Sequence, residues 1–560
     1  MEFSMSNFHE KVIYQIYPKS FKDSNGDGVG DLRGVIEKIP YLSDLGVDMI
    51  WLNPFFCSPQ NDNGYDISNY LAIDPLFGTM ADFEELVRET QKLGIEIMLD
   101  MVLNHTSVEH EWFQKALAGD KKYQDYYYIR EPKADGSLPT NWESKFGGPS
   151  WTPFGETGKY FLNLYDRTQA DLNWHNPTVR EELFAVVNFW LEKGVKGFRF
   201  DVMNVIGKPL ELVDDLTGNG KSLYTDQPIV HEYLMELNKA SFGKEEDSVT
   251  VGEMSSTTID NCVMYSNPDR NELSMAFSFH HLKVDYLDGE KWSLMPFDFM
   301  ELKTILNDWQ EGMSEGNGWN ALFWNNHDQP RALSRFGDPI HYRFETATML
   351  AQTIHLLRGT PYIYQGEEIG MLNPDFADIK DYVDIETHNA YKELQEKGLS
   401  EAEIMAIIQE KSRDTSRTPM QWDSTENAGF STGEPWLKVA DNYSLINVKK
   451  EREEGQIFNY YQSLIQLRKE MKVISEGAYR SLLMEHPSVY GYVRELDSEQ
   501  VLVLNNFYGE STSVDIPMEF IDQESRYLIG NGKKRKLTSK IHLEPYETIA
   551  FYIEKQHNNY

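Results

Sequence analysis

The sequence predicts an α/β protein built on a (β/α)8 TIM barrel, with a small domain inserted after the third strand and an antiparallel β-sandwich domain at the C-terminal end. Three observations support this prediction. Short apolar runs alternate with amphipathic helical stretches over most of the chain. A long stretch after the third apolar run loses the helical period. After Met471 the pattern changes to alternating, β-type segments such as Val489-Tyr490-Gly491-Tyr492-Val493.

Eight apolar runs are expected to form the parallel strands, because eight is the number that closes such a barrel. The runs are Val12–Tyr17, Val47–Leu52, Ile95–Val102, Gly197–Val202, Thr250–Glu253, Leu273–Phe279, Asn320–Trp324 and Pro361–Tyr364. The helical stretches between them include Met80–Leu93, Val179–Lys193, Phe299–Glu311 and Tyr342–Leu357.

The interruption after the third strand predicts a small domain that overhangs one end of the barrel. Turn-forming residues such as Gly147-Gly148-Pro149 replace the helical pattern between Asn104 and about Pro177. A second polar excursion begins near Asn373. We therefore divide the chain into a first barrel part (1–104), an inserted domain (105–176), a second barrel part (177–477) and a C-terminal β domain (478–560).

Composition narrows the class of protein. The formal net charge of -36 disfavours nucleic acid as a partner, since such a surface repels polyphosphates. The two cysteines, Cys57 and Cys262, give no disulfide framework or zinc site. No apolar run is long enough to cross a membrane, and the segment Met1–Glu10 has no signal-peptide pattern. We expect a cytoplasmic protein that is monomeric or weakly homo-oligomeric and has no membrane partner.

Three acidic residues end or follow apolar strand candidates: Asp201, Glu253 and Asp328. Unpaired carboxylates are costly to bury, and the carboxyl ends of barrel strands are where barrel enzymes carry their chemistry. Any one of these residues could instead be a strand-end cap or a turn former. Together they predict a carbohydrate-cleaving site with a nucleophile, a proton donor and a third, assisting acid.

Five short segments resemble the α-amylase superfamily of glycoside hydrolases, and one of them resembles its oligo-1,6-glucosidase branch. The four hallmark segments occur in order, and the branch segment lies between the first two. They are Asp100-Met101-Val102-Leu103-Asn104-His105, Gln169-Ala170-Asp171-Leu172-Asn173-Trp174, Gly197-Phe198-Arg199-Phe200-Asp201, Val251-Gly252-Glu253 and Asn326-His327-Asp328.

The resemblance implies a role for each acid. Asp201 would attack the anomeric carbon, and Arg199, two residues earlier on the same strand face, is expected to lower its pKa. Glu253 would protonate the departing oxygen. Asp328 would bind the 2- and 3-hydroxyls of the sugar. Retention of configuration would require the Asp201 and Glu253 carboxyls to lie about 5–5.5 Å apart.

The resemblance also implies a closed pocket for one terminal glucose. His105 and His327 match residues that hydrogen bond this glucose, although an isolated histidine is usually structural. Asp62 and Tyr65 match residues that close the pocket, and Arg413 matches the arginine that pairs with the first of them. Such a charge pair would restrict the enzyme to removing one terminal glucose.

The segment from Asp23 to Asp31 spaces oxygen ligands at alternate positions, as calcium loops do. In relatives the equivalent loop binds calcium, so we expect a structural Ca²⁺ rather than a plain polar turn. No organic cofactor is expected. The candidate ligands are Asp23, Asn25, Asp27, Val29 and Asp31.

Within the branch, the segment Phe279–Tyr286 resembles enzymes that hydrolyse trehalose 6-phosphate to glucose and glucose 6-phosphate. Oligo-1,6-glucosidases typically have Glu-His-Met-Asp where this chain has His280-His281-Leu282-Lys283. The exchange replaces acids by bases, and a phosphate is bound by basic side chains. The candidate phosphate ligands are Lys283, Lys291, His280, His281 and Arg331, although both lysines could equally be solvated surface charges.

Other functions remain open at this point. The nearest alternative is an α-1,6-glucosidase acting on unphosphorylated, isomaltose-like sugars. Isomerisation or glucosyl transfer would use the same intermediate while excluding water. A non-catalytic barrel that serves as an accessory subunit is disfavoured, because such relatives lose the three carboxylates.

Overall fold

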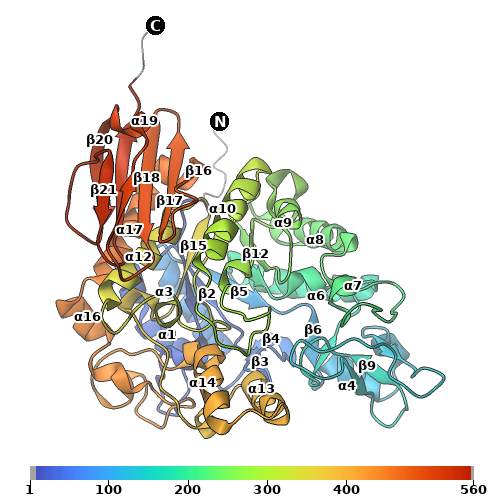
Figure 1. The fold of residues 1–560 in the computed structure, drawn as a ribbon. Helices are drawn as coiled ribbons and strands as arrows, with labels where there is room; N and C mark the ends of the chain where they lie inside the picture. Colours follow the sequence, from blue (N-terminus) through green and yellow to red (C-terminus); the bar gives the residue numbers. More distant parts are fainter. Residues whose placement is uncertain (1–7, 557–560) are drawn as a thin grey trace.

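The computed structural model describes residues 8–556 and contains an eight-stranded parallel sheet at its centre (Figure 1). The strands follow one another in the order β13-β12-β11-β5-β2-β1-β15-β14, and a parallel bridge between Ala276 and Asn320 joins the two ends. The strands are β1 (Ile13–Ile16), β2 (Met49–Leu52), β5 (Glu96–Met101), β11 (Gly197–Phe200), β12 (Val249–Glu253), β13 (Met275–Phe277), β14 (Ala321–Leu322) and β15 (Thr360–Tyr364). The predicted barrel is confirmed.

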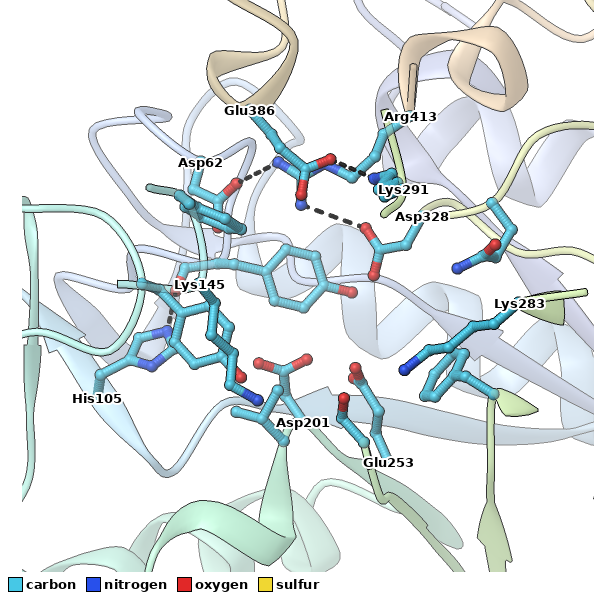
Figure 2. A pocket seen from close by; sticks show the side chains of 17 residues that line it. Asp62, His105, Lys145, Asp201, Glu253, Lys283, Lys291, Asp328, Glu386 and Arg413 are labelled. Carbon is cyan, nitrogen blue, oxygen red and sulfur yellow. Dashed lines mark hydrogen bonds and ion pairs between the residues drawn. The ribbon is translucent and has the colours of Figure 1, made fainter. Parts of the chain in front are cut away.

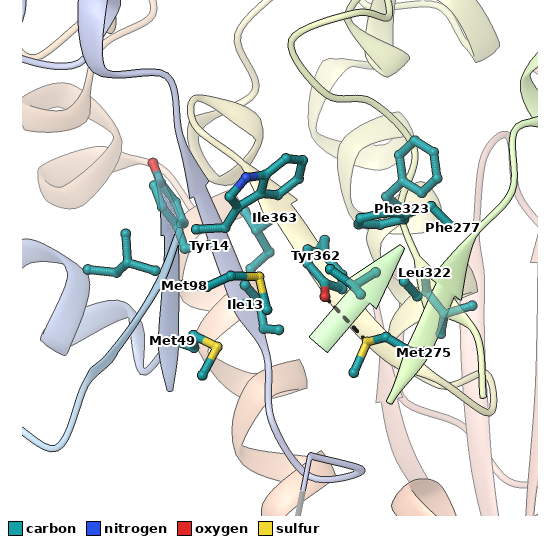
Figure 3. Packing of buried hydrophobic residues seen from close by; sticks show 14 of the residues in the cluster. Ile13, Tyr14, Met49, Met98, Met275, Phe277, Leu322, Phe323, Tyr362 and Ile363 are labelled. Carbon is teal, nitrogen blue, oxygen red and sulfur yellow. Dashed lines mark hydrogen bonds between the residues drawn. The ribbon is translucent and has the colours of Figure 1, made fainter. Parts of the chain in front are cut away.

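The interior of the barrel is filled by large apolar side chains (Figure 3). Met49, Met98 and Met275 come from three of the strands, and the hydroxyl of Tyr362 lies 3.3 Å from the sulfur of Met275. Because the barrel is packed rather than hollow, a ligand can bind only beyond the strand ends. The inward-facing residues of the strands are therefore core, and the polar residues that follow the strands are available for a site.

Helices cover the outside of the barrel, and some of them begin at a capping side chain. Thr79 and Asp82 form a capping box at the start of α3, and Asn176 caps α6, whose first residue is Pro177. The main covering helices are α1 (Leu32–Glu37), α2 (Ile39–Leu45), α3 (Met80–Lys92), α6 (Pro177–Glu192), α8 (Pro228–Ala240), α9 (Ile259–Ser266), α10 (Phe299–Glu315), α11 (Ala332–Phe336), α12 (Arg343–His355), α17 (Ile457–Glu470) and α18 (Lys472–Glu476).

The segment after β5 contains small sheets and two short helices, α4 (Glu111–Leu117) and α5 (Lys121–Gln124). Strands β6 (His105–Ser107) and β10 (Gln169–Asp171) pair with each other, and β7 (Ile129–Arg130), β9 (Tyr160–Leu162) and β8 (Trp151–Pro153) form a three-stranded sheet. This segment extends to one side of the barrel (Figure 1).

The second polar excursion, which begins near Asn373, forms helices beside the end of the barrel that the inserted segment also flanks. They are α13 (Ile385–Glu396), α14 (Glu401–Lys411) and α15 (Asp414–Arg417).

The C-terminal part is an antiparallel sheet domain, as expected. Strands of the larger sheet are β16 (Ala478–Leu482), β17 (Val489–Leu496), β18 (Glu499–Asn506), β22 (Thr548–Glu554) and β20 (Glu524–Gly530), and β19 (Thr512–Asp515) pairs with β21 (Lys540–Leu543). Apolar side chains of both sheets share one buried cluster. The predicted domain boundaries remain a proposal, and the first and last of them lie outside the described residues, as does most of Met1–Glu10.

Within residues 8–556, no helix is long and apolar enough to cross a membrane.

Candidate active site

Asp201, Glu253 and Asp328 line one cavity at the carboxyl ends of the barrel strands (Figure 2). Asp201 directly follows β11, and Glu253 is the last residue of the neighbouring strand β12. Asp328 lies in the loop after β14. The cavity has a volume of about 190 Å³.

A buried arginine links two of the three acids. Nη1 of Arg199 lies 2.6 Å from Oδ1 of Asp201 and 3.0 Å from Oδ1 of Asp100. Nη2 of Arg199 contacts Oε2 of Glu253, and the guanidinium also lies over the ring of Trp51, 5.0 Å from its centroid. Since Asp201 and Glu253 share one guanidinium, their carboxyls are close neighbours, and their expected separation stays a prediction.

Arg199 lowers the pKa of Asp201, as expected, but in the free protein it does not keep that pKa low. Burial, and then the charge of Glu253, raise the pKa of Asp201 well above its ordinary value, although Arg199 opposes both effects. In the free protein, burial and the charge of Glu253 therefore disfavour the ionised form of Asp201.

Asp328 is held in the ionised form by arginines from the second excursion. Its Oδ1 accepts a hydrogen bond of 2.9 Å from Nη2 of Arg417 and one of 3.4 Å from Nη1 of Arg413. Nε2 of His327 lies 3.3 Å from its Oδ2, but burial lowers the pKa of His327 far below 6.5 and leaves the ring neutral. Although burial raises the pKa of Asp328, its cationic neighbours hold that pKa well below the ordinary range.

Arg413 also closes one end of the cavity. Its Nη2 lies 3.2 Å from Oδ1 of Asp62, so the ion pair expected from the sequence forms. Asp384 receives the closer contacts, 2.6 Å from Nη2 and 2.9 Å from Nε. Burial raises the pKa of Asp62 to about 7 against the opposing charge of Arg413. Gln169, from the branch segment, donates a 3.0 Å hydrogen bond to Asp62.

Tyr65 and His105 line the cavity on the same side as Asp62. The hydroxyl of Tyr65 donates a 2.7 Å hydrogen bond to Asp100, and its ring stacks on that of His327 at 5.2 Å. Nε2 of His105 lies 3.1 Å from the carbonyl oxygen of Tyr65, and burial lowers the pKa of His105 to about 4. A neutral His105 can donate one hydrogen bond without adding charge.

Two of the five candidate phosphate ligands, Lys283 and Lys291, line the cavity. Three are corrected, because their polar groups bind backbone carbonyls elsewhere and they do not line it. Nε2 of His280 contacts the carbonyl of Thr257, and Nε2 of His281 contacts that of Phe323. The guanidinium of Arg331 donates to the carbonyls of Gln365 and Ser416. Sequence proximity to the motifs suggested these three, but side-chain direction decides against direct contact.

Several lining or supporting residues were missed by the sequence analysis. Most lie in turn-rich segments, where no periodicity indicates which way a side chain points. A partial signal was the spacing of Arg413 and Arg417, which places both on one side of a helical turn. The missed residues are Lys145, Phe146, Tyr165, Asp384, Glu386 and Arg417.

The residue after Asp201 has a strained backbone. Val202 lines the cavity and has φ 40°, in the left-handed region that β-branched residues disfavour. Such strain persists only where surrounding structure imposes it, and it is concentrated at functional sites. The strain is located immediately after the candidate nucleophile.

The loop proposed for calcium is compact and held by its own side chains. Oδ1 of Asp23 accepts hydrogen bonds from the backbone of Asn25 and Gly26, and Oδ2 accepts one from Ser431. Burial, and then the charge of Asp23, raise the pKa of Asp27, which fits acids that face each other across an ion site. Among residues 8–556, however, no three His, Cys, Asp or Glu side chains are grouped closely enough to hold a metal.

An eight-stranded parallel barrel with three carboxylates converging at its strand ends defines a glycoside hydrolase. Residues 15–477 match the family described as "Alpha amylase, catalytic domain", and residues 489–550 match "Alpha-amylase SusG C-terminal domain". The chain belongs to the α-amylase family.

Curated relatives and solved structures match over nearly the whole chain. A trehalose-6-phosphate hydrolase of Bacillus subtilis is 52% identical, over 97% of this chain and 98% of the relative. An oligo-1,6-glucosidase of Parageobacillus thermoglucosidasius is 47% identical, over 97% and 98%. The crystal structure of trehalose-6-phosphate hydrolase from Bacillus licheniformis superposes with a TM-score of 0.94 at 51% identity, covering 98% of this chain and 100% of that one.

Proposed function

We propose that this protein is a retaining, exo-acting α-glucosidase that hydrolyses trehalose 6-phosphate to glucose and glucose 6-phosphate. One observation carries the proposal. A single cavity is lined by three carboxylates and by Lys283 and Lys291, and it is closed at one end by Arg413 and Asp62 (Figure 2). The relatives named trehalose-6-phosphate hydrolase, from B. subtilis and B. licheniformis, support the same substrate.

The reaction takes place in two steps. In the first, an oxygen of ionised Asp201 forms a bond to C1 of the unphosphorylated glucose as the bond from C1 to the bridging oxygen breaks. Glu253 gives its proton to that oxygen, and glucose 6-phosphate departs. In the second step, ionised Glu253 takes a proton from water, and the resulting oxygen displaces Asp201 from C1. Two inversions at C1 give glucose with retained configuration.

The first step needs one ionised carboxyl as the nucleophile and one protonated carboxyl as the proton donor. Arg199 contacts both carboxyls and therefore positions the pair. Asp328, ionised beside Arg413 and Arg417, would accept hydrogen bonds from the 2- and 3-hydroxyls as the ring distorts.

An α-1,6-glucosidase acting on unphosphorylated sugars is the second candidate. The oligo-1,6-glucosidase of P. thermoglucosidasius is 47% identical to the chain, so the barrel and carboxylates do not separate the two functions. The observation that favours trehalose 6-phosphate is the presence of lysines in the lining of the cavity, because a phosphate carries about −1.5 to −2 charges at neutral pH.

Product analysis with trehalose 6-phosphate, trehalose and isomaltose tests the proposal. We expect glucose and glucose 6-phosphate in equal amounts from the first, with kcat/KM at least tenfold higher than for the other two. Preferential cleavage of isomaltose would refute this proposal and favour the second candidate, an α-1,6-glucosidase. Asp201→Asn and Glu253→Gln should each lower kcat by about 10³-fold or more. A variant of either residue with near-wild-type kcat would refute the assigned roles.

Calcium binding by the loop is a further part of the proposal. Asp23, Asn25, Asp27 and Asp31, with the main-chain carbonyl of Val29, supply the oxygen ligands that Ca²⁺ prefers. A bound Ca²⁺ would stabilise the loop and take no part in the reaction. Chelator treatment should lower Tm, and Ca²⁺ should restore it; no change would exclude the ion. A cytoplasmic location and a monomeric or weakly associating state are proposed from the sequence alone.

A further inference from the structure

Three lysine side chains near the active-site cavity have no anionic partner. They are Lys145, Lys221 and Lys283. Within residues 8–556, none of their ammonium groups pairs with a carboxylate or donates a hydrogen bond. The three ammonium groups are nevertheless close enough for charge to act between some of them. Lys221 lowers the pKa of both other lysines, and Lys283 lowers that of Lys145.

The other lysines around the cavity are neutralised. Nζ of Lys291 contacts Oε1 of Glu386, and Nζ of Lys208 lies 2.6 Å from Oδ2 of Asp171. A buried or half-buried cation without a counter-ion is unfavourable, so native proteins normally pair it. Three unpaired lysines beside two paired ones indicate that their counter-ion comes from a ligand.

The three lysines come from separate parts of the chain that the fold brings together. Lys145 lies in the loop before β8, Lys221 is the first residue of α7 (Lys221–Tyr224), and Lys283 follows the short helix η5 (His280–Leu282). Gly220 holds α7 against the inserted segment, because a Cβ at that position would lie 2.4 Å from Cγ of Trp142. The cluster therefore depends on an interface that tolerates no side chain at residue 220.

Lys145 is directed into the cavity by its surroundings. It lines the cavity with Lys283, and Figure 2 shows both ammonium groups pointing toward the Asp201–Glu253 pair from different sides. Nζ of Lys145 lies 5.8 Å from the ring centroid of Tyr165 and 5.7 Å from that of Tyr224, which is cation–π range. Burial, together with the charge of Lys221, lowers the pKa of Lys145 to about 7.

We propose that Lys145 and Lys283 together bind the phosphate of the leaving sugar and that Lys221, set behind the lining, adds a third positive charge. The inference rests on the proposed function and extends it to residues of the inserted segment and of α7. A phosphate with about −1.5 to −2 charges would compensate two ammonium groups, and charge-assisted hydrogen bonds are the strong ones. The site would then discriminate phosphorylated from unphosphorylated substrates.

The test compares two substrates in matched variants. For Lys145→Met we expect the ratio of kcat/KM for trehalose 6-phosphate to that for p-nitrophenyl α-glucoside to fall by about tenfold to a hundredfold. Lys221→Met should lower the ratio by a smaller factor. Lys159→Met is the control, because Lys159 lies in the same inserted segment with an exposed side chain paired at 3.8 Å to Glu131. It should leave the ratio unchanged.

A second measurement does not depend on trehalose 6-phosphate turnover. Glucose 6-phosphate should inhibit hydrolysis of the aryl glucoside in the wild type, and Lys145→Met should raise its inhibition constant at least tenfold while glucose inhibition changes little. Without ligand, Lys145→Met should have a Tm equal to or above that of the wild type, since it removes charge repulsion. A lower Tm would indicate a structural role for Lys145.

The outcomes separate the two proposals. If the wild type fails to cleave trehalose 6-phosphate, the proposed function is wrong whatever the lysines do. If the wild type cleaves it and Lys145→Met behaves like Lys159→Met in both assays, the function stands and the assignment of Lys145 is overturned.

Discussion

His355 should make the protein sensitive to acid. It lies at the end of α12 with no exposed surface, and neither ring nitrogen has a hydrogen-bond partner. Burial, with the charges of Arg468 and Lys469, lowers its pKa to about 3. An unfolded histidine takes up its proton near pH 6.5, whereas the folded one stays neutral. The stability that His355 contributes is therefore complete above pH 6.5 and is lost as pH falls toward 3.

The size of this loss follows from linkage. Each pH unit between the two pKa values changes the free energy of unfolding by about 1.4 kcal/mol. Between pH 6.5 and pH 5 the loss attributable to His355 is therefore about 2 kcal/mol. In His355→Leu, which removes the titrating group and leaves no hydrogen bond broken, the acid-induced loss should be smaller by that amount.

Urea unfolding followed by tryptophan fluorescence at pH 7 and pH 5 measures the difference between the two proteins. Comparing the loss of unfolding free energy in the variant with that in the wild type cancels the contributions of the other titrating groups. His542→Gln is the control, because His542 is exposed and its contact with Glu544 is a surface ion pair of small value. If His355→Leu and the wild type lose the same stability on acidification, the buried histidine does not contribute and the reasoning fails.

Three further substitutions test other contacts. Lys208→Met leaves the buried carboxylate of Asp171 unpaired, so we expect a loss of about 3–5 kcal/mol in unfolding free energy, seen as a lower urea midpoint; a midpoint equal to the wild type's would contradict this. Lys303→Met removes three hydrogen bonds to backbone carbonyls of the C-terminal sheet domain, and hydrogen exchange in that domain should rise while the barrel remains protected. Arg413→Lys cannot reproduce the two-atom contact with Asp384, so KM should rise by about tenfold or more for phosphorylated and unphosphorylated substrates alike. A rise for only one substrate class would place Arg413 outside the glucose pocket.

The sequence predicted the barrel because its determinants are local. Each strand is a short apolar run, and several helices begin at a residue whose side chain caps them, such as Thr79 or Asn176. The positions of Asp201 and Glu253 at strand ends followed from the same pattern, since strand ends of a parallel barrel face one side. The sequence therefore identified the residues that reach the site from regular secondary structure.

The sequence could not predict side-chain direction in irregular segments. His281 and Arg331 lie close to the motifs in sequence, but their polar groups bind backbone carbonyls and do not reach the cavity. Lys145 lies in a turn-rich loop where no periodicity exists, and it nevertheless points into the cavity. The net pKa of Asp201 was also misjudged, because burial and the charge of Glu253 outweigh the opposing charge of Arg199.

The distribution of charge in the cavity accounts for the orientation of the proposed substrate. At the closed end, Asp62 and Asp328 have arginines as partners, so that end offers hydrogen-bond acceptors to a neutral sugar and no free cation. Lys145 and Lys283, which point toward the Asp201–Glu253 pair from different sides, are unpaired and attract an anion. Entering with the phosphate first would place a dianion beside two carboxylates, which is repulsive at short range. The neutral glucose therefore enters first, its C1 stops beside Asp201, and cleavage releases the phosphorylated half toward solvent.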